Sequence, residues 1–426
     1  MTKADHQPPS LLPARPVWAL VLDNQLTAPP AYDDTHAFFS IEGDRLVAYE
    51  LPSGKQAWIV SAHSRMEPAT GGGLLFLIEP GTLKARRAAD GSIAWELPFE
   101  EEVAVRSVFD NGWLIVSTEA GEILAFRAAD GHLVWRRDMK SRASAAPALT
   151  ADRVYVSVGD GRVVALRVED GEPVWERRLG GAPNDILALD ERLYVGSKDN
   201  FLYCLMTEDG RIDWRWRTGG DVIGRPIADQ QRVYFVSLDN VLRALNLKSG
   251  GQHWMRPLPM RPVSGPIRAG STIVVSGVAA ALHAYDVSDG KPAPGEPLKP
   301  GLPPVASKAA ASKPPPGDGP VIAELSMEDA LASMPSAIPP EIAGASTPAS
   351  GLAASIAADA EVGAPPHAIE DPLTHLPMVL IITRDIARGA AATLVARDFE
   401  PSLSPVVALP NLIMIAPATT TPPPVR

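Results

Sequence analysis

The sequence has a single cysteine, Cys204, among its 426 residues. One thiol cannot form an internal disulfide or supply a zinc site built on cysteine ligands. Long apolar runs are also lacking, since none approaches the ~20 residues of a transmembrane helix. Residues 1–18 hold neither the apolar core of a signal peptide nor a lipidation cysteine. We therefore expect a chain without a membrane span and, as written, without an export signal.

Basic residues are in the minority, with 39 Lys and Arg against 50 Asp and Glu and a net charge of −11. Binding to a phosphate backbone needs clustered Lys and Arg, so this balance argues against a nucleic-acid partner. The eight histidines show no metal-ligand spacing, and the sequence contains no nucleophile elbow, phosphate-binding loop or dinucleotide fingerprint. We assign no catalytic, cofactor-binding or metal-ligating residue from the sequence.

What the sequence does contain is a tryptophan that recurs about every forty residues. Successive members of the series are 40, 37, 40, 40, 39 and 40 residues apart. A fixed period of this length indicates a repeat architecture. The series consists of Trp18, Trp58, Trp95, Trp135, Trp175, Trp214 and Trp254.

Two further positions recur in phase with this series. From Trp58 onward a turn glycine precedes each Trp by four residues, and a small residue precedes that glycine by six. We interpret each Trp as a structural docking residue, whose indole packs against a neighbouring strand where only Ala or Cys leaves room. Cys204 occupies one of these positions, which predicts a buried structural thiol. The turn glycines are Gly54, Gly91, Gly131, Gly171, Gly210, Gly250 and Gly290, and the small residues are Ala48, Ala85, Ala125, Ala165, Cys204, Ala244 and Ala284.

Each repeat predicts four short β-strands. In one copy a β-branched run at 154–158 is followed by the hairpin turn Asp160-Gly161 and then by two further strands, the last centred on Trp175. A shorter strand at 147–150 precedes the run. Four antiparallel strands per forty residues predict an all-β fold, a β-propeller. The strand-type alternation excludes a helical solenoid.

The repeat resembles that of the PQQ-like, or quinoprotein-like, β-propellers. In that family a small residue is followed by a turn such as Asp-Gly and then by a Trp on the outer strand, as at Ala125, Asp130-Gly131 and Trp135. The resemblance covers about residues 15–290 and implies a propeller that usually has eight blades. By similarity to the BamB-like outer-membrane assembly lipoproteins, it implies a monomeric, non-catalytic scaffold that binds a protein partner in the periplasm or cell envelope.

The same family includes PQQ-dependent dehydrogenases. These enzymes hold the quinone on the propeller axis between a Trp and a disulfide of adjacent cysteines, beside calcium and a catalytic Asp. A chain with one cysteine cannot supply that disulfide, and the aspartates of the repeat match turn positions. We therefore expect no enzyme and no cofactor. Binding of PQQ or another small ligand in the axial funnel, as a quinoprotein-type oxidoreductase or a sensor, is the alternative.

The domain boundaries follow from where the repeat stops. Pro294 stands where the seventh copy should carry its Trp, and Trp18 is an outer-strand Trp with no repeat before it. We expect the N-terminal strand around Trp18 to complete the last blade, because a propeller closes its ring to hide its edge strands. The predicted parts are a flexible N-terminus at 1–14, seven blades at 15–295, a disordered Pro/Ala-rich insertion at 296–366, a last blade at 367–416 and a flexible C-terminus at 417–426.

The pattern within the last blade is less regular. Residues 377–383 are its predicted first hairpin strand, 390–398 its second, with Ala396 in the small-residue position, and 406–409 an outer strand. Eight blades are favoured over seven, because a seven-bladed ring would leave the apolar run 378–382 in an unpaired strand. Within the insertion, residues 325–334 predict no more than a transient helix capped by Ser326.

Two tryptophans fall outside the series, Trp113 and Trp216. Trp216 follows Trp214 by two residues, at a position where two other copies have arginine, and Trp113 aligns with Arg153. A large aromatic side chain that replaces arginine on a repeat surface is a candidate contact to a protein partner. The alternative is packing between blades.

Overall fold

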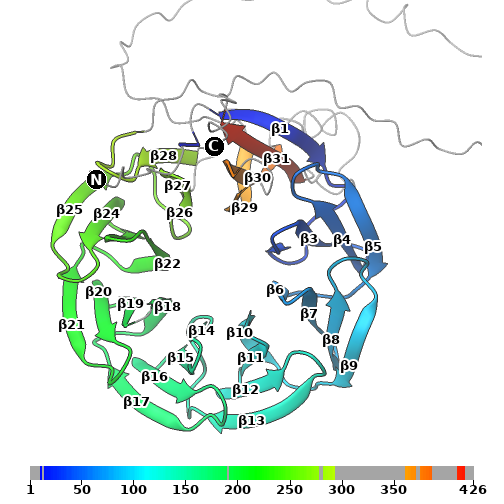
Figure 1. Ribbon diagram of the computed structural model, residues 1–426, viewed down its shortest axis with the longest axis horizontal. Helices are drawn as coiled ribbons and strands as arrows, with labels where there is room; N and C mark the ends of the chain where they lie inside the picture. The colour runs from blue at the N-terminus through cyan, green and yellow to red at the C-terminus, as the bar shows by residue number, and fades with distance from the viewer. Residues whose placement is uncertain are drawn as a thin grey trace, which may run out of the picture. The chain divides into compact units, whose positions relative to one another are not determined.

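All regular structure in the described residues is β-strand, and neighbouring strands within each sheet are antiparallel. These strands form eight sheets, seven of four strands and one of three. The sheets follow one another around a ring (Figure 1), so the predicted all-β fold of four-stranded antiparallel sheets is confirmed. The computed structural model describes residues 10–11, 14–189, 191–277, 282–292, 360–370, 375–385 and 410–417.

The sheets are numbered here from 1 to 8 around the ring, and their strands are given from the axis outward. Sheet 1 consists of β2 (Ala31–Tyr32), β3 (His36–Ile41), β4 (Arg45–Glu50) and β5 (Gln56–Ser61). Sheet 2 consists of β6 (Ala69–Gly71), β7 (Leu74–Glu79), β8 (Thr82–Arg87) and β9 (Ile93–Pro98). Sheet 3 consists of β10 (Val103–Asp110), β11 (Trp113–Thr118), β12 (Glu122–Arg127) and β13 (His132–Asp138). Sheet 4 consists of β14 (Ala148–Leu149), β15 (Arg153–Ser157), β16 (Arg162–Arg167) and β17 (Pro173–Arg178).

The second half of the ring continues in the same way. Sheet 5 consists of β18 (Pro183–Leu189), β19 (Arg192–Ser197), β20 (Phe201–Met206) and β21 (Ile212–Arg217). Sheet 6 consists of β22 (Val222–Ala228), β23 (Arg232–Ser237), β24 (Val241–Asn246) and β25 (Gln252–Pro257). Sheet 7 has three strands, β26 (Ile267–Ala269), β27 (Thr272–Ser276) and β28 (Leu282–Asp286). Sheet 8 consists of β29 (Ala360–Glu370), β30 (Pro377–Asp385), β31 (Pro410–Pro417) and β1 (Ala14–Val21).

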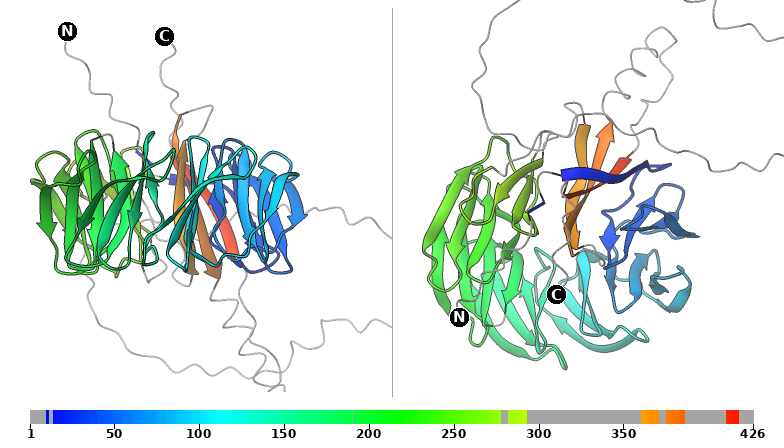
Figure 2. Two further views of the ribbon diagram at one scale, coloured as in Figure 1. Left: turned by 90° about the horizontal axis from the view of Figure 1, so that it is seen from below. Right: turned by 45° about the horizontal axis from the view of Figure 1, so that its top comes forward.

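The N-terminal strand closes the ring. β1 is the outer strand of sheet 8 and pairs with β31, with Trp18 opposite Met414. Figure 2 shows β1 lying along the C-terminal strands. The prediction that the strand around Trp18 completes the last sheet is confirmed.

The structure differs from the sequence prediction at the edges of sheet 8. β29 begins at Ala360, so residues 360–366 belong to the inner strand and not to the predicted insertion. β30 contains the predicted first hairpin strand, but its partner is β31, so Met414 and not Ala396 faces Trp18. The two other predicted strands, at 390–398 and 406–409, and the predicted helix at 325–334 lie outside the described residues.

Each Trp of the series bridges two neighbouring sheets. The indole Nε1–H donates to a main-chain carbonyl three residues before the turn glycine of the next sheet, at 2.7–3.2 Å. The indole rings also lie on these turn glycines. The donor–acceptor pairs are Trp18–Leu51, Trp58–Ala88, Trp95–Ala128, Trp135–Val168, Trp175–Thr207, Trp214–Leu247 and Trp254–Val287.

Within its own sheet, each Trp from Trp58 onward stands directly opposite the small residue on the third strand, as at Ala125–Trp135 and Cys204–Trp214. In five sheets a Phe or Tyr stands on the far side of that residue, and its ring centroid lies 5.7–6.0 Å from that of the indole. A larger residue between the two rings would hold them apart, which explains the Ala and Cys at this position.

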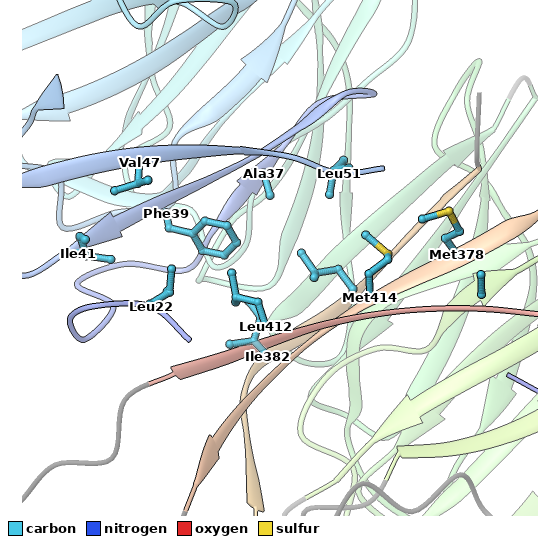
Figure 3. Packing of buried hydrophobic residues seen from close by; sticks show 12 residues of the cluster. Leu22, Ala37, Phe39, Ile41, Val47, Leu51, Met378, Ile382, Leu412 and Met414 are labelled. Carbon is cyan, nitrogen blue, oxygen red and sulfur yellow. The ribbon is translucent and has the colours of Figure 1, made fainter. Parts of the chain in front are cut away.

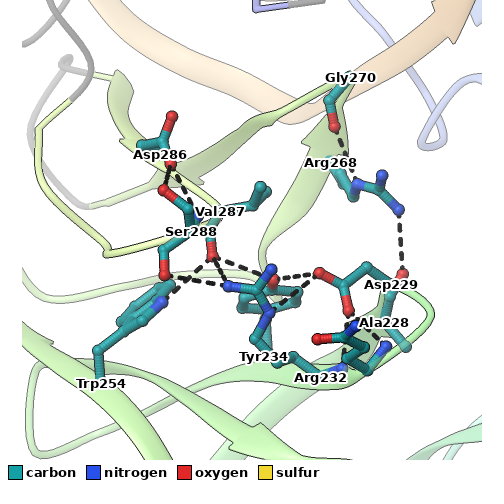
Figure 4. Close-up of polar contacts among 11 residues, drawn as sticks. Ala228, Asp229, Arg232, Tyr234, Trp254, Arg268, Gly270, Asp286, Val287 and Ser288 are labelled. Carbon is teal, nitrogen blue, oxygen red and sulfur yellow. Dashed lines mark hydrogen bonds and ion pairs between the residues drawn. The ribbon is translucent and has the colours of Figure 1, made fainter. Parts of the chain in front are cut away.

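Figure 4 shows these contacts between sheets 6 and 7. The carbonyl of Val287 accepts hydrogen bonds from Trp254 at 3.2 Å and from the Arg232 guanidinium at 2.7 Å. The Tyr234 hydroxyl lies 3.2 Å from the same carbonyl and 2.6 Å from a carboxylate oxygen of Asp229. Side chains from two strands of sheet 6 therefore hold the turn of sheet 7.

Apolar clusters fill the space between sheets. The cluster between sheets 8 and 1 joins Ile382, Leu412 and Met414 to Phe39 and Val47 (Figure 3). All five side chains are at most 2% exposed. Residues far apart in the sequence are thus joined in one core where the ring closes.

The junction between sheets 7 and 8 is built differently, because the sequence has Pro294 where a Trp would stand. Leu11 packs here with residues of both sheets and is 1% exposed. Its main-chain N–H donates to Thr272 Oγ1 at 3.1 Å, and Ser10 forms a bridge with Gly270. Ser10 and Leu11 are therefore held in place, although the sequence predicts a flexible segment over residues 1–14.

Candidate functional site

One residue of each sheet stands at an equivalent position on the axis of the ring. Following the strand registers inward from each Trp leads to one residue of the inner strand, for example from Trp135 through Ala125 and Ile115 to Val108. In sheet 7, whose described strands have no Trp, the same path starts from Ala284 and ends at Ile267. The residue two positions before this inner-strand residue is called here the axial ring residue. In order of sheets, the axial ring is Pro29, Glu67, Arg106, Ala146, Asp185, Arg225, Gly265 and Pro365.

All eight axial ring residues line one cavity of about 880 Å³. Every sheet contributes to its wall, so the cavity follows the axis. Six of the eight ring residues are followed by a proline, which inner edge strands tolerate because proline lacks a main-chain N–H. These prolines are Pro30, Pro68, Pro147, Pro226, Pro266 and Pro366.

Four of the ring residues are charged, and they alternate in sign along the ring. Glu67 and Arg106 lie on sheets 2 and 3 and approach to 3.8 Å. Asp185 and Arg225 lie on sheets 5 and 6, and neither side chain has a hydrogen bond or an ion pair with another described residue. The small residue Ala146 separates the two pairs.

Burial controls the protonation of these groups more than pairing does. The pKa of the Asp185 carboxyl is raised by burial, although Arg106 and Arg225 act to lower it. The pKa of Glu67 is raised for the same reason. The side chain of Arg225 opens into the cavity, but the surrounding walls still desolvate its guanidinium group. This desolvation lowers the pKa of Arg225, and the positive charge of Arg106 lowers it further. Each of these groups is thus shifted toward its neutral form.

The wall of the cavity near the ring closure contains a stacked aromatic pair. The rings of Tyr32 on sheet 1 and His367 on sheet 8 lie 3.8 Å apart with an angle of 4° between their planes. Burial lowers the pKa of His367 to about 4, so the imidazole is neutral at pH 7. The hydroxyl of Tyr32 is buried without a hydrogen-bond partner among the described residues.

The cavity does not fit the quinone cofactor that the repeat family implies. PQQ carries three carboxylates, and the cavity wall has three carboxylates of its own, Glu67, Asp110 and Asp185, against the guanidinium groups of Arg106 and Arg225. The lone thiol, Cys204, is buried within a sheet and cannot provide the disulfide that holds PQQ. Among the described residues, no group of three His, Cys, Asp or Glu side chains is arranged to hold a metal ion.

The two predicted partner contacts lie away from this cavity. Trp113 and Trp216 are partly buried, and each packs against an apolar cluster between two sheets. At the position of Trp216, Arg137 and Arg177 donate to the carbonyl of the next turn glycine at 2.8 and 2.7 Å. This repeat position therefore faces the neighbouring sheet. The role of Trp113 and Trp216 in partner binding remains a prediction.

Sequence reasoning from the Trp series alone does not identify the charged axial residues. Their signal is nevertheless present, because Arg106, Asp185 and Arg225 each lie 29 residues before a Trp of the series. Glu67 lies 28 residues before Trp95. A charged residue at this phase marks the axis, but only the strand registers show that the position faces a cavity.

The family model described as outer membrane protein assembly factor BamB matches residues 13–96, 79–189 and 184–300. The comparison with curated proteins gave no match. Within the described ranges, no helix has the length and apolarity needed to cross a membrane.

Solved structures with the same fold are distant in sequence. BamB from Moraxella catarrhalis is 21% identical, with 65% of this chain and 89% of that chain covered and a TM-score of 0.54. The computationally designed Ika8 protein is 12% identical over 64% and 86% of the two chains, with a TM-score of 0.57. The C-terminal WD40 domain of Sif2 is 11% identical over 64% and 84%, with a TM-score of 0.52. At these identities the likeness establishes the propeller fold alone.

Proposed function

This chain belongs to the family described as outer membrane protein assembly factor BamB, and from that membership we propose that it is a non-catalytic scaffold for a protein partner in outer-membrane protein assembly. At the level of the family, a repeat propeller of this kind is a protein-binding scaffold. The observation that carries the proposal is the family match over three consecutive segments, which together span residues 13–300. The proposal places the protein in the cell envelope as a monomeric propeller.

The outer surface of the ring is suited to contact with another protein. Its outer strands alternate between exposed and partly buried residues and expose large apolar side chains on neighbouring sheets. Single exposed apolar residues are ordinary, but here they recur on the consecutive sheets 8, 1, 2, 3 and 4, with one more on sheet 6, and form a belt along this part of the ring. The belt consists of Val17, Ile59, Ile93, Leu133, Val134, Val174 and Met255, each 38–46% exposed.

Affinity capture from native cells tests this proposal. The intact protein should retain a component of the machinery that inserts outer-membrane proteins, and a variant lacking residues 302–351 should retain the same component if the propeller binds it. Replacing Ile93 and Leu133 together by Glu should reduce the captured amount without changing the melting temperature, because both side chains are exposed. Capture that contains no envelope protein at all would overturn the proposal.

The alternative function, binding of PQQ in the axial funnel, has a simple test. A ligand that binds only the folded state raises its melting temperature. Because the carboxylates of the cavity wall repel a tricarboxylate, we expect PQQ with calcium to leave the melting temperature unchanged at saturating concentration. A clear increase would restore the quinoprotein alternative.

A further inference from the structure

Asp185 and Arg225 form a pair of opposite charges that is left open on the axis. They occupy equivalent ring positions on the neighbouring sheets 5 and 6. Both line the same cavity, yet no hydrogen bond or ion pair joins either side chain to another described residue, and the Asp185 carboxyl accepts a hydrogen bond only from its own main chain. Arg106 and, to a smaller extent, Arg225 lower the pKa of the Asp185 carboxyl, although neither guanidinium group forms an ion pair with it.

Comparable charges elsewhere in the ring are paired. Arg243 and Asp239 of sheet 6 approach to 2.5 Å, and Arg192 and Asp213 of sheet 5 to 3.2 Å. The fold therefore pairs carboxylates with guanidinium groups in these same two sheets. An open pair on the axis is not needed to hold the sheets together, since the Trp contacts do this.

The open pair is partly desolvated, since Asp185 is half-buried and Arg225 is open to the cavity. Partly desolvated charges are unfavourable unless they are hydrogen-bonded or paired, and burial shifts both groups toward their neutral forms. Perturbed ionisable groups in a cavity are characteristic of binding sites. The flanking ring residues are Ala146 and Gly265, so the space beside the pair is not filled by side chains.

The wall beside the pair also carries an exposed apolar side chain. Val263, two residues before Gly265 on sheet 7, lines the cavity and is 55% exposed. Together with the ring prolines it gives the cavity an apolar patch beside two opposite charges. A ligand that matches this surface has an apolar body and carries both an anion and a cation.

We propose that the axial cavity binds a short zwitterionic peptide, whose carboxylate is held by Arg225 and whose ammonium group is held by Asp185. Arginine suits this role because its planar guanidinium group donates two parallel hydrogen bonds to a carboxylate. A carboxylate at Asp185 accepts hydrogen bonds from an ammonium group. The proposal is independent of outer-membrane assembly, because it concerns a small ligand and not the protein partner.

Calorimetric titration of the full chain with three dipeptides tests the proposal. The probes are Leu-Leu, N-acetyl-Leu-Leu, which lacks the cation, and Leu-Leu amide, which lacks the anion. We expect Leu-Leu to bind about tenfold more tightly than either blocked form, because each charge-assisted contact that is lost weakens binding by roughly this factor. The same titration measures the four variants described next.

The variants assign each end of the ligand to one residue. Arg225→Gln should bind Leu-Leu and Leu-Leu amide equally, and Asp185→Asn should bind Leu-Leu and N-acetyl-Leu-Leu equally. Arg217→Gln, on the outer strand of sheet 5, and Asp110→Asn, in the cavity but off the ring, should keep the wild-type preference. Cooperative melting of every variant shows that it is folded.

Two results would overturn the proposal. One is that Leu-Leu produces no binding heat at millimolar concentration. The other is that the preference for free termini survives in both Arg225→Gln and Asp185→Asn, since binding would then take place elsewhere. Neither result depends on partner capture, so failure of this proposal and failure of the proposed scaffold function are distinguishable.

Discussion

The indole of Trp135 lies directly on Gly171 of the next sheet. A Cβ atom added at Gly171 would come within 2.6 Å of the Trp135 ring, and the indole N–H donates to Val168 at 2.7 Å. The same contact joins a Trp to a turn glycine at seven successive junctions of the ring, from Trp18–Gly54 to Trp254–Gly290. Each indole therefore links its own sheet to the next one, and the repeat of the sequence is a repeat of junctions.

Replacing Gly171 by Ala tests this junction. Gly171 has a φ of +69°, and Gly112, on an exposed turn of sheet 3, has a φ of +83° with no atom within 4 Å of an added Cβ. Gly112→Ala should therefore cost only the backbone strain of about 1–2 kcal/mol. Gly171→Ala should cost about 1–3 kcal/mol more, because the methyl group displaces the indole. Chemical denaturation measures both values, and equal losses would contradict the docking of Trp135.

Cys204 allows a test of the small-residue position. It is fully buried, lies between Tyr194 and Trp214 across the sheet, and burial raises the pKa of its thiol to about 12. Cys204→Ala should change the free energy of unfolding by no more than about 1 kcal/mol, since alanine fills this position in other sheets. Cys204→Leu should cost about 1–3 kcal/mol, because it forces the two rings apart.

The same thiol should be unreactive in the folded protein. Only the thiolate reacts with alkylating reagents, and a pKa of about 12 leaves almost none of it at pH 8. Iodoacetamide should therefore label Cys204 in denaturant and not in buffer. Rapid labelling of the native protein would show that the strand around Cys204 opens.

Two variants of Trp216 distinguish a role in packing between sheets from a role in partner binding. Because its side chain packs against the cluster between sheets 5 and 6, Trp216→Ala should lower stability by about 1–3 kcal/mol. Trp216→Arg should lose less, because arginine at this position of other sheets bonds to the next turn glycine. Partner capture is measured on both variants at a temperature where both are folded. Loss of capture in both would support a contact role, and unchanged capture would count against it.

His367 should make stability depend on pH. Its pKa falls from 6.5 to about 4 on folding, so the unfolded chain binds more protons between these values. The contribution of His367 to the free energy of unfolding is fully present above pH 6.5. It is lost as the pH falls toward 4, and the loss is at most about 3 kcal/mol. The raised pKa values of Glu67 and Asp185 act in the opposite direction, since stability from them is lost as the pH rises.

A His367→Phe variant separates the effect of His367 on the pH dependence of stability from the effects of Glu67 and Asp185. Phenylalanine keeps a ring against Tyr32 but does not titrate, so the variant should lose less stability than the wild type between pH 6.5 and 4. Thermal melts across this range measure the difference. Parallel curves for the two proteins would show that His367 is not buried as a neutral ring.

Local sequence patterns determine most of the ring. Alternating β-branched residues, turn glycines and in-phase Trp and Ala positions specify four short strands and their order, because these are short-range preferences repeated in every copy. The closing strand follows from Trp18, whose outer-strand pattern has no repeat before it. The second hairpin strand of sheet 8 could not be predicted in the same way, since β31 has Met414 where the other copies have Ala or Cys.

The tertiary structure alone decided what lies on the axis and at the last junction. Glu67, Arg106, Asp185 and Arg225 lie 39, 79 and 40 positions apart in succession along the sequence and meet only because the ring closes. Leu11 fills the junction of sheets 7 and 8 for the same reason. A local pattern specifies which residues form a strand and which face is buried, whereas the convergence of equivalent positions on one axis depends on the packing of all the sheets together.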